Sequence, residues 1–79
     1  MSNRVNGHAK FQTSLVPAPK GTTWEEAQPY VWAAVRELGY KWVRLIEEVH
    51  EGVVTAPDGY TTYDLTDNNI FCFRVEYGK

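Results

Sequence analysis

Residues 22–38, TTWEEAQPYVWAAVREL, decide the fold, because they carry the start, the apolar face and the end of one amphipathic helix. Thr23 followed by Glu26 predicts a capping box, in which a hydroxyl and a carboxylate bind backbone N–H groups at the helix start. Thr22 with Glu25 fits the same pattern one residue earlier. Apolar residues then recur at steps of three and four, which predicts one buried stripe: Trp24, Ala27, Val31, Ala34, Val35 and Leu38. Gly39 ends the helix.

Two residues interrupt this pattern. Pro29 in the helix interior would remove one hydrogen bond and crowd the carbonyl of Glu25. Either the helix kinks there, or a short turn at residues 24–28 precedes a main helix that begins with Pro29, and we favour the second. Trp32 falls at the border of the stripe, so it is either the edge of the core or an exposed aromatic with a partner.

Size and composition limit the chain to one domain with a thin core. It has 79 residues, of which 43% are apolar and 23% charged, and a domain of this size buries only about 60% of its unfolded surface. No run approaches the ~20 apolar residues of a membrane span, and residues 1–11 lack the apolar centre of a secretory signal. The single cysteine, Cys72, excludes an internal disulfide and suits a reducing cytoplasm.

The net charge of −2 is unevenly distributed along the chain. Residues 1–23 contain three basic groups and no acid, whereas residues 24–79 contain five basic and ten acidic groups. The main part of the domain therefore carries a net charge of −5 and is expected to repel the phosphates of nucleic acids.

The segments around the helix predict strands. Residues 1–9 read as a flexible arm, and residues 10–16 (KFQTSLV) as a first strand that PAPKG then ends. Residues 40–52 (YKWVRLIEEVHEG) fit a helix through Trp42, Leu45, Ile46 and Val49, or a central strand with apolar groups on both faces. Their β-branched and aromatic content favours the strand.

The carboxy-terminal part predicts a hairpin and a final strand. Residues 53–55 and 60–65 flank Asp58-Gly59, a turn sequence that suits positive φ. After the turn-rich residues 66–69, residues 70–77 alternate, with four apolar residues on one face and Cys72, Arg74 and Glu76 on the other. The sequence thus predicts an α+β fold: residues 10–79 form one β-α-β-β-β domain with one helix on an antiparallel sheet. The other sheet face is expected to be open or covered by another chain.

The sequence contains no pattern that predicts a catalytic or metal-binding site. Cys72 is expected mid-strand among aromatics, where a thiol is usually an inert small hydrophobe. His8 and His50 lie in an arm and at a turn, so no Cys–His pair is expected. The acidic residues of the 64–69 segment lack the spacing of a calcium loop. Glu47 and Glu48 would point to opposite faces of a strand and could not converge on one substrate atom.

The chain resembles the dodecins, small flavin-binding oligomers, over about two-thirds of its length. TTWEEA at the helix start, Trp42-Val43 in a strand, PDG and an aromatic-alternating last strand carry the resemblance. It implies a homo-oligomer that stacks flavin on Trp42. The flavin-contacting glutamine of that family has no counterpart in IFCFRVEY, and residues 60–69 are longer than in the family.

The sequence favours surface recognition over catalysis. It holds more aromatics than a thin core easily buries, and aromatics rimmed by charge are typical of protein interfaces. We expect a non-enzymatic module without cofactor or metal that docks on a larger protein, resembling in size and acidity the small inhibitors that phages and mobile elements encode. The candidate contacts are Trp32, Tyr60, Glu47, Glu48, Glu51, Asp64 and Asp67. A dodecin-like flavin carrier and a small enzyme are the alternatives, and the oligomeric state stays open.

Overall fold

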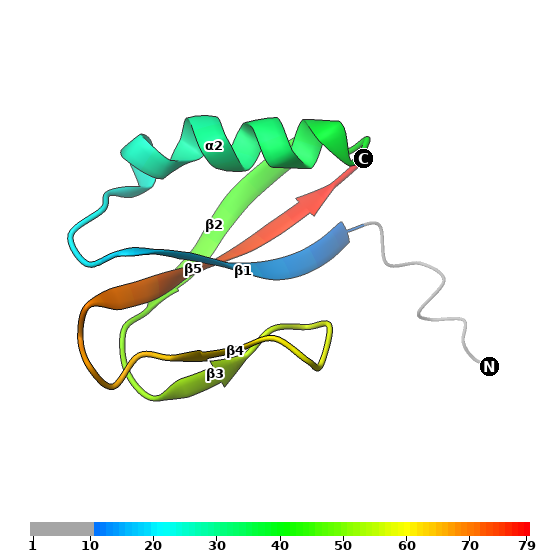
Figure 1. The fold of residues 1–79 in the computed structure, drawn as a ribbon. Helices are drawn as coiled ribbons and strands as arrows, with labels where there is room; N and C mark the ends of the chain where they lie inside the picture. Colours follow the sequence, from blue (N-terminus) through cyan, green and yellow to red (C-terminus); the bar gives the residue numbers. More distant parts are fainter. Residues whose placement is uncertain (1–10) are drawn as a thin grey trace.

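The computed structural model describes residues 11–79, and within them it shows one small domain with one helix and five strands (Figure 1). In chain order these are β1 (Phe11–Pro19), α2 (Trp24–Glu37), β2 (Trp42–Val49), β3 (Val53–Thr55), β4 (Thr62–Asp64) and β5 (Ile70–Gly78). The predicted α+β class and order of elements are confirmed, with the hairpin contributing both β3 and β4. The expected arm, residues 1–9, lies outside the described residues. Among residues 11–79, no helix has the length and apolar content needed to cross a lipid bilayer.

The helix α2 is continuous, so the expectation of a separate turn at residues 24–28 is wrong. The capping box forms as predicted: Glu26 N–H donates to Thr23 Oγ1 at 3.1 Å, and Thr23 N–H donates to Glu26 Oε1 at 2.9 Å. Pro29 lies inside the helix on its exposed side, although a proline in a helix interior costs about 3 kcal/mol. Ala27 before the proline and Val31 after it are both buried. An unbroken helix buries both on one face, which offsets the lost hydrogen bond.

The first strand continues through Pro17 to Pro19, so the prediction that it ends at residue 16 is wrong. In an antiparallel ladder, the backbone groups of successive residues point alternately toward the partner strand and away from it. Lys20 N–H donates to the Asn69 carbonyl at 2.9 Å and continues the β1–β5 register, so the even-numbered residues of β1 face β5. Both prolines therefore stand at outward-facing positions, where the missing N–H removes no bond to β5.

The main sheet has the order β1-β5-β2, with both outer strands antiparallel to β5. Residues 42–49 form a strand, as favoured, but β2 is an edge strand, and the expectation of a central strand covered on both sides is wrong. The last strand of the chain takes the centre instead, because α2 carries the chain from β1 across β5 to β2 (Figure 1). The polar second half of β2, which contains Glu47 and Glu48, is compatible with an exposed edge.

The helix covers one face of this sheet and lies closest to β2. Side chains from α2, β2 and β5 form the main core there: Ala27, Val31, Val35, Val43, Phe71, Phe73 and Val75 are buried. Trp24 packs on Phe73 with 5.4 Å between ring centroids. The alternation predicted for the last strand is confirmed on this face, where Phe71, Phe73 and Val75 meet the helix.

The opposite sheet face is half covered by the hairpin of β3 and β4, which forms a two-stranded sheet of its own beneath β1 and β5 (Figure 1). Leu15, Leu65 and Cys72 are buried in this second core, with Val54 and Tyr63 packed against it. The expectation that this face is open or needs another chain is therefore wrong at the Cys72 end. The reason is that β3 and β4 pair only with each other, which leaves them free to fold under the sheet.

Candidate docking surfaces

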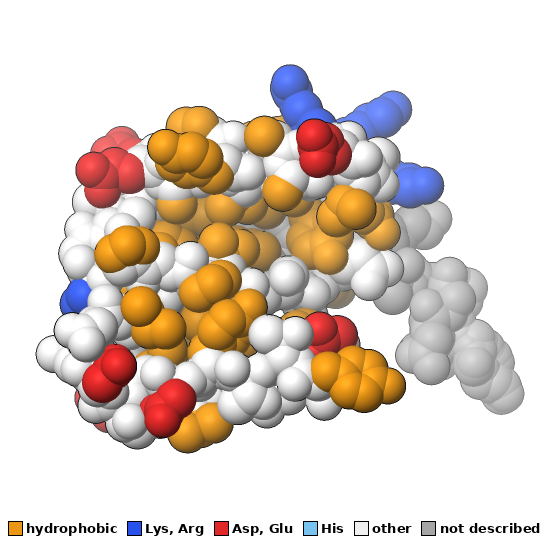
Figure 2. Space-filling model, in the orientation of Figure 1, with side chains coloured by type: hydrophobic (Ala, Val, Ile, Leu, Met, Phe, Trp, Pro, Cys, Tyr) orange, Lys and Arg blue, Asp and Glu red, His pale blue; other side chains and the backbone are white. Residues whose placement is uncertain are grey.

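The hairpin layer, which we define as residues 51–69, carries charge of one sign only. Its charged residues are Glu51, Asp58, Asp64 and Asp67, and it contains no lysine, arginine or histidine. Figure 2 shows acidic and apolar side chains over the lower part of the molecule, whereas most lysine and arginine side chains on this face gather at the carboxyl end of the helix and one lies at the opposite edge. Four of the seven predicted contact residues, namely Tyr60, Glu51, Asp64 and Asp67, belong to this layer.

The turn at the tip of the hairpin presents Tyr60 to solvent. The Asp58 carboxylate accepts hydrogen bonds from Tyr60 N–H at 2.8 Å, Thr61 N–H at 2.9 Å and Thr61 Oγ1 at 2.8 Å. Gly59 takes φ of 81° between them, a conformation that glycine adopts without strain. The bonds from Thr61 and Tyr60 lower the pKa of Asp58. Tyr60 is 90% exposed on this fixed turn.

The carboxylates at the other end of the hairpin layer also hold turns. Asp64 Oδ1 accepts hydrogen bonds from the hydroxyl and the N–H of Thr66, at 2.6 and 3.0 Å, and these bonds lower the pKa of Asp64. Asp67 Oδ1 accepts from Asn69 N–H at 3.0 Å. Each bond uses one oxygen of a carboxylate that is exposed to water, so the other oxygen stays accessible to a partner.

Glu47 and Glu48 lie outside the hairpin layer, and each has a partner within the chain. Arg74 Nε donates to Glu47 Oε2 at 2.8 Å, and the imidazole of His50 lies 2.8 Å from Glu48 Oε1. The β2 register shifts between residues 45 and 47. Of the five predicted carboxylates, Glu51, Asp64 and Asp67 belong to the hairpin layer, whereas Glu47 and Glu48 belong to β2.

Trp32 and Trp42 are both partly buried within the chain, so each offers a partner only part of its ring. Trp32 is half-buried against the main core, with the Arg36 guanidinium 5.4 Å from its ring centroid. Trp42, which the dodecin resemblance would use for flavin stacking, is also half-buried, and the Arg44 guanidinium lies 5.9 Å from its ring.

No group of three metal-ligating side chains occurs among residues 11–79. Cys72 is fully buried, and burial raises the pKa of its thiol. The His50 ring stacks on Phe71, with 4.5 Å between centroids, and Phe71 belongs to the helix-covered core, whereas Cys72 belongs to the hairpin-covered core. Cysteine and histidine therefore lie at opposite faces of the sheet.

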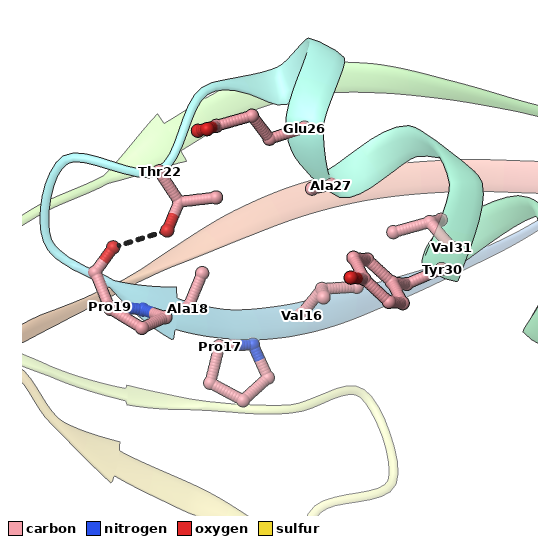
Figure 3. Close-up of a pocket in the computed structure, with 9 residues that line it drawn as sticks. All are labelled: Val16, Pro17, Ala18, Pro19, Thr22, Glu26, Ala27, Tyr30 and Val31. Atoms are coloured by element: carbon pink, nitrogen blue, oxygen red, sulfur yellow. Dashed lines mark hydrogen bonds between the residues drawn. The ribbon is translucent and has the colours of Figure 1, made fainter.

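A second surface, which sequence reasoning missed, is an apolar groove between α2 and β1. A cavity of about 390 Å³ lies between Pro19 and Tyr30 (Figure 3), and a second of about 180 Å³ continues toward Leu38. Both are lined by Val16, Tyr30 and Val31. Ala34 and Leu38, predicted as part of the buried stripe, are exposed here, with Leu38 65% exposed. Their exposure follows from the position of the helix near β2, which leaves the β1 side uncovered.

Tyr30 forms the outer wall of this groove and is 79% exposed. The helical spacing alone shows that Tyr30 lies beside the apolar stripe. It does not show which strand lies next to Tyr30, because that depends on the order of the strands in the sheet. Glu26 is the only charged residue among the described residues that line the two cavities.

Comparison with protein-family models, with curated proteins and with solved structures finds no match for this chain.

Proposed function

We propose that this protein is a non-enzymatic binding module that docks on a larger protein through its hairpin layer. The observation that carries the proposal is Tyr60, an aromatic side chain that is 90% exposed on a turn fixed by three hydrogen bonds to Asp58. A tyrosine loses little conformational entropy when it binds, and a preformed turn lowers the cost of docking further.

The charges of the hairpin layer define the partner as a basic protein surface. The segment contains four carboxylates and no lysine or arginine, so it produces a negative field that steers a positively charged surface toward the module. The same field opposes direct binding to nucleic acid. A basic surface that normally accepts phosphates would meet the carboxylates in their place, which is the basis for the finer expectation of a small inhibitor of phage or mobile-element type.

Affinity capture with matched variants tests the proposal. The tagged protein is incubated with an extract of the cells that make it, and retained proteins are compared among wild type, Tyr60→Ala and the double variant Asp64→Lys, Asp67→Lys. Truncation of an anchor residue costs at least about 2 kcal/mol, or roughly 30-fold in affinity. Both variants are therefore expected to lose a partner that the wild type retains, and higher salt should weaken its capture.

Tyr30→Ala is the matched control, because it removes another strongly exposed tyrosine, 79% against 90% for Tyr60, from the other surface. Retention of the same partner by this control and its loss from Tyr60→Ala would support docking by the hairpin layer. A partner that Tyr60→Ala and the lysine variant still retain at the wild-type level would contradict it.

A further inference from the structure

The outer edge of β1 has unpaired backbone groups within the described part of the chain. The odd-numbered residues of β1 face away from β5, so the N–H groups of Phe11, Thr13 and Leu15 point outward. Beyond them, Pro17 and Pro19 have no N–H to offer. The first half of this edge is therefore able to pair with another strand, and the second half is not.

The two edges of the sheet differ in their protection against such pairing. The β2 edge has an irregular register between residues 45 and 47 and carries Arg44, Glu47 and Glu48. Bulges and charged side chains are the usual means by which proteins prevent edge strands from associating. By contrast, β1 (FQTSLVPAP) contains no charged residue, and only its prolines limit pairing. The segment 11–15 is an unprotected edge.

Both sides of this segment are accessible. On the helix side lies the open groove, lined there by Ser14, Tyr30 and Leu38. On the hairpin side, a pocket of about 300 Å³ separates Thr13 from the turn at Pro57. Open space therefore lies beside this segment on both faces of the sheet.

We propose that the occupant of this edge is a second copy of the chain, paired antiparallel through β1 with Thr13 on the two-fold axis. In this register Phe11 faces Leu15 of the second copy, and Thr13 faces Thr13. All three outward N–H groups of each copy then meet outward carbonyls, and pairing ends before Pro17. Shifting the register by two residues toward the carboxyl end would place Pro17 opposite Phe11 and lose a donor in each copy. The uncharged sequence allows strand–strand contact on the axis without charge repulsion.

The product is a closed dimer with a six-stranded sheet of order β2-β5-β1-β1-β5-β2. A two-fold axis perpendicular to the sheet places both helices on one face and both hairpins on the other. The grooves of the two copies join over the β1–β1 seam, where each contributes Tyr30. The Tyr60 turns are not part of the pairing, so this dimer is independent of the docking function proposed above.

Sedimentation equilibrium with a Thr13→Lys variant tests the dimer. Thr13 lies opposite Glu76 of β5, so a lysine at this position meets an acidic neighbour within its own chain and preserves the fold. Across the two-fold axis, the two lysines would face each other and repel. We expect the wild type to reach twice the chain mass of 9.1 kDa at high concentration, and the variant to stay at the chain mass with an unchanged circular dichroism spectrum.

Two further variants make the test specific. Ile46→Lys places the same side chain on the β2 edge, where it should leave the dimer intact. Thr13→Pro removes only an outward N–H, as Pro17 already does, and should also yield a monomer. A monomeric wild type, a dimer that survives Thr13→Lys, or a mass that grows beyond two chains would overturn the proposal. A monomer whose Thr13 amide resists hydrogen exchange would also overturn it, because the edge would then be protected without a second copy.

Discussion

The two faces of the central sheet are covered in different ways, by a helix on one side and by a hairpin on the other. Seven buried residues form the helix-side core, whereas three form the hairpin-side core. The helix connects the two outer strands of one sheet, but the hairpin pairs only with itself and is held to the sheet by side chains. We infer that the helix side supplies most of the stability and that the hairpin layer is the more independent unit.

The largest effect is expected from Phe73→Ala, on the helix side. Phe73 is fully buried and contacts Trp24 and Phe71. A Phe→Ala change in a core costs about 3–5 kcal/mol, whereas a 79-residue domain is stable by roughly 4–12 kcal/mol. Urea unfolding of the variant should show a much lower midpoint, with helix and hairpin signals lost together. A decrease in the free energy of unfolding of less than about 1 kcal/mol would contradict our inference that the helix side supplies most of the stability.

A smaller and more local effect is expected from Leu65→Ala, on the hairpin side. Leu65 is 1% exposed and anchors the hairpin against Leu15 and Cys72. The change should cost about 2–4 kcal/mol. If the hairpin is an independent unit, native-state hydrogen exchange should show the amides of β3 and β4 opening at lower free energy than those of β5.

Val53→Ala is the control for this second prediction, because Val53 lies on the same hairpin with its side chain exposed. It should change stability by less than about 0.5 kcal/mol. Uniform loss of protection across β3, β4 and β5 in Leu65→Ala would mean that both faces unfold as one unit.

The helix side was largely predictable from the sequence, because local signals specify it. The Thr23–Glu26 capping box and the alternation of residues 70–77 appear in the structure as expected. Local rules failed at the prolines. Pro29 stays in the helix because the packing of the buried helix face offsets the lost hydrogen bond. Pro17 stays in a strand because its missing N–H would point away from the partner strand.

The hairpin itself was predicted, but its position over the second face of the sheet was not. That position and the groove depend on the order of the strands, which local sequence does not specify. Nothing local in Val53–Thr55 says which sheet the hairpin pairs with or which face it covers. Likewise, Leu38 continues the apolar stripe in sequence, and its exposure arises only from the position of the helix near β2. Of the predicted contacts, Tyr60 could be placed at a turn from the Asp58-Gly59 signal, but the pairing of Glu47 with Arg74 could not.

The smallest effect concerns the pH response of the hairpin turn. The backbone bond from Thr61, followed by those from Tyr60 N–H and the Thr61 hydroxyl, lowers the pKa of Asp58 in the folded state. A lowered folded-state pKa means that the carboxylate stabilises the turn above its unfolded pKa of about 3.9, and that this contribution is lost as the pH falls through the lowered value. The amide shifts of Tyr60 and Thr61, followed by NMR from pH 6 to 2, should therefore move together below pH 4.

Asp58→Asn separates this local titration from the rest of the protein. The amide oxygen still accepts hydrogen bonds but carries no charge, so the Tyr60 and Thr61 shifts should lose their titration below pH 4. Buried amides of β5, such as that of Phe73, should be unaffected by the substitution in the same range. Because the helix side contains no buried charged group among the described residues, an acid transition that begins there rather than at the turn would contradict the view that the hairpin is the more independent layer.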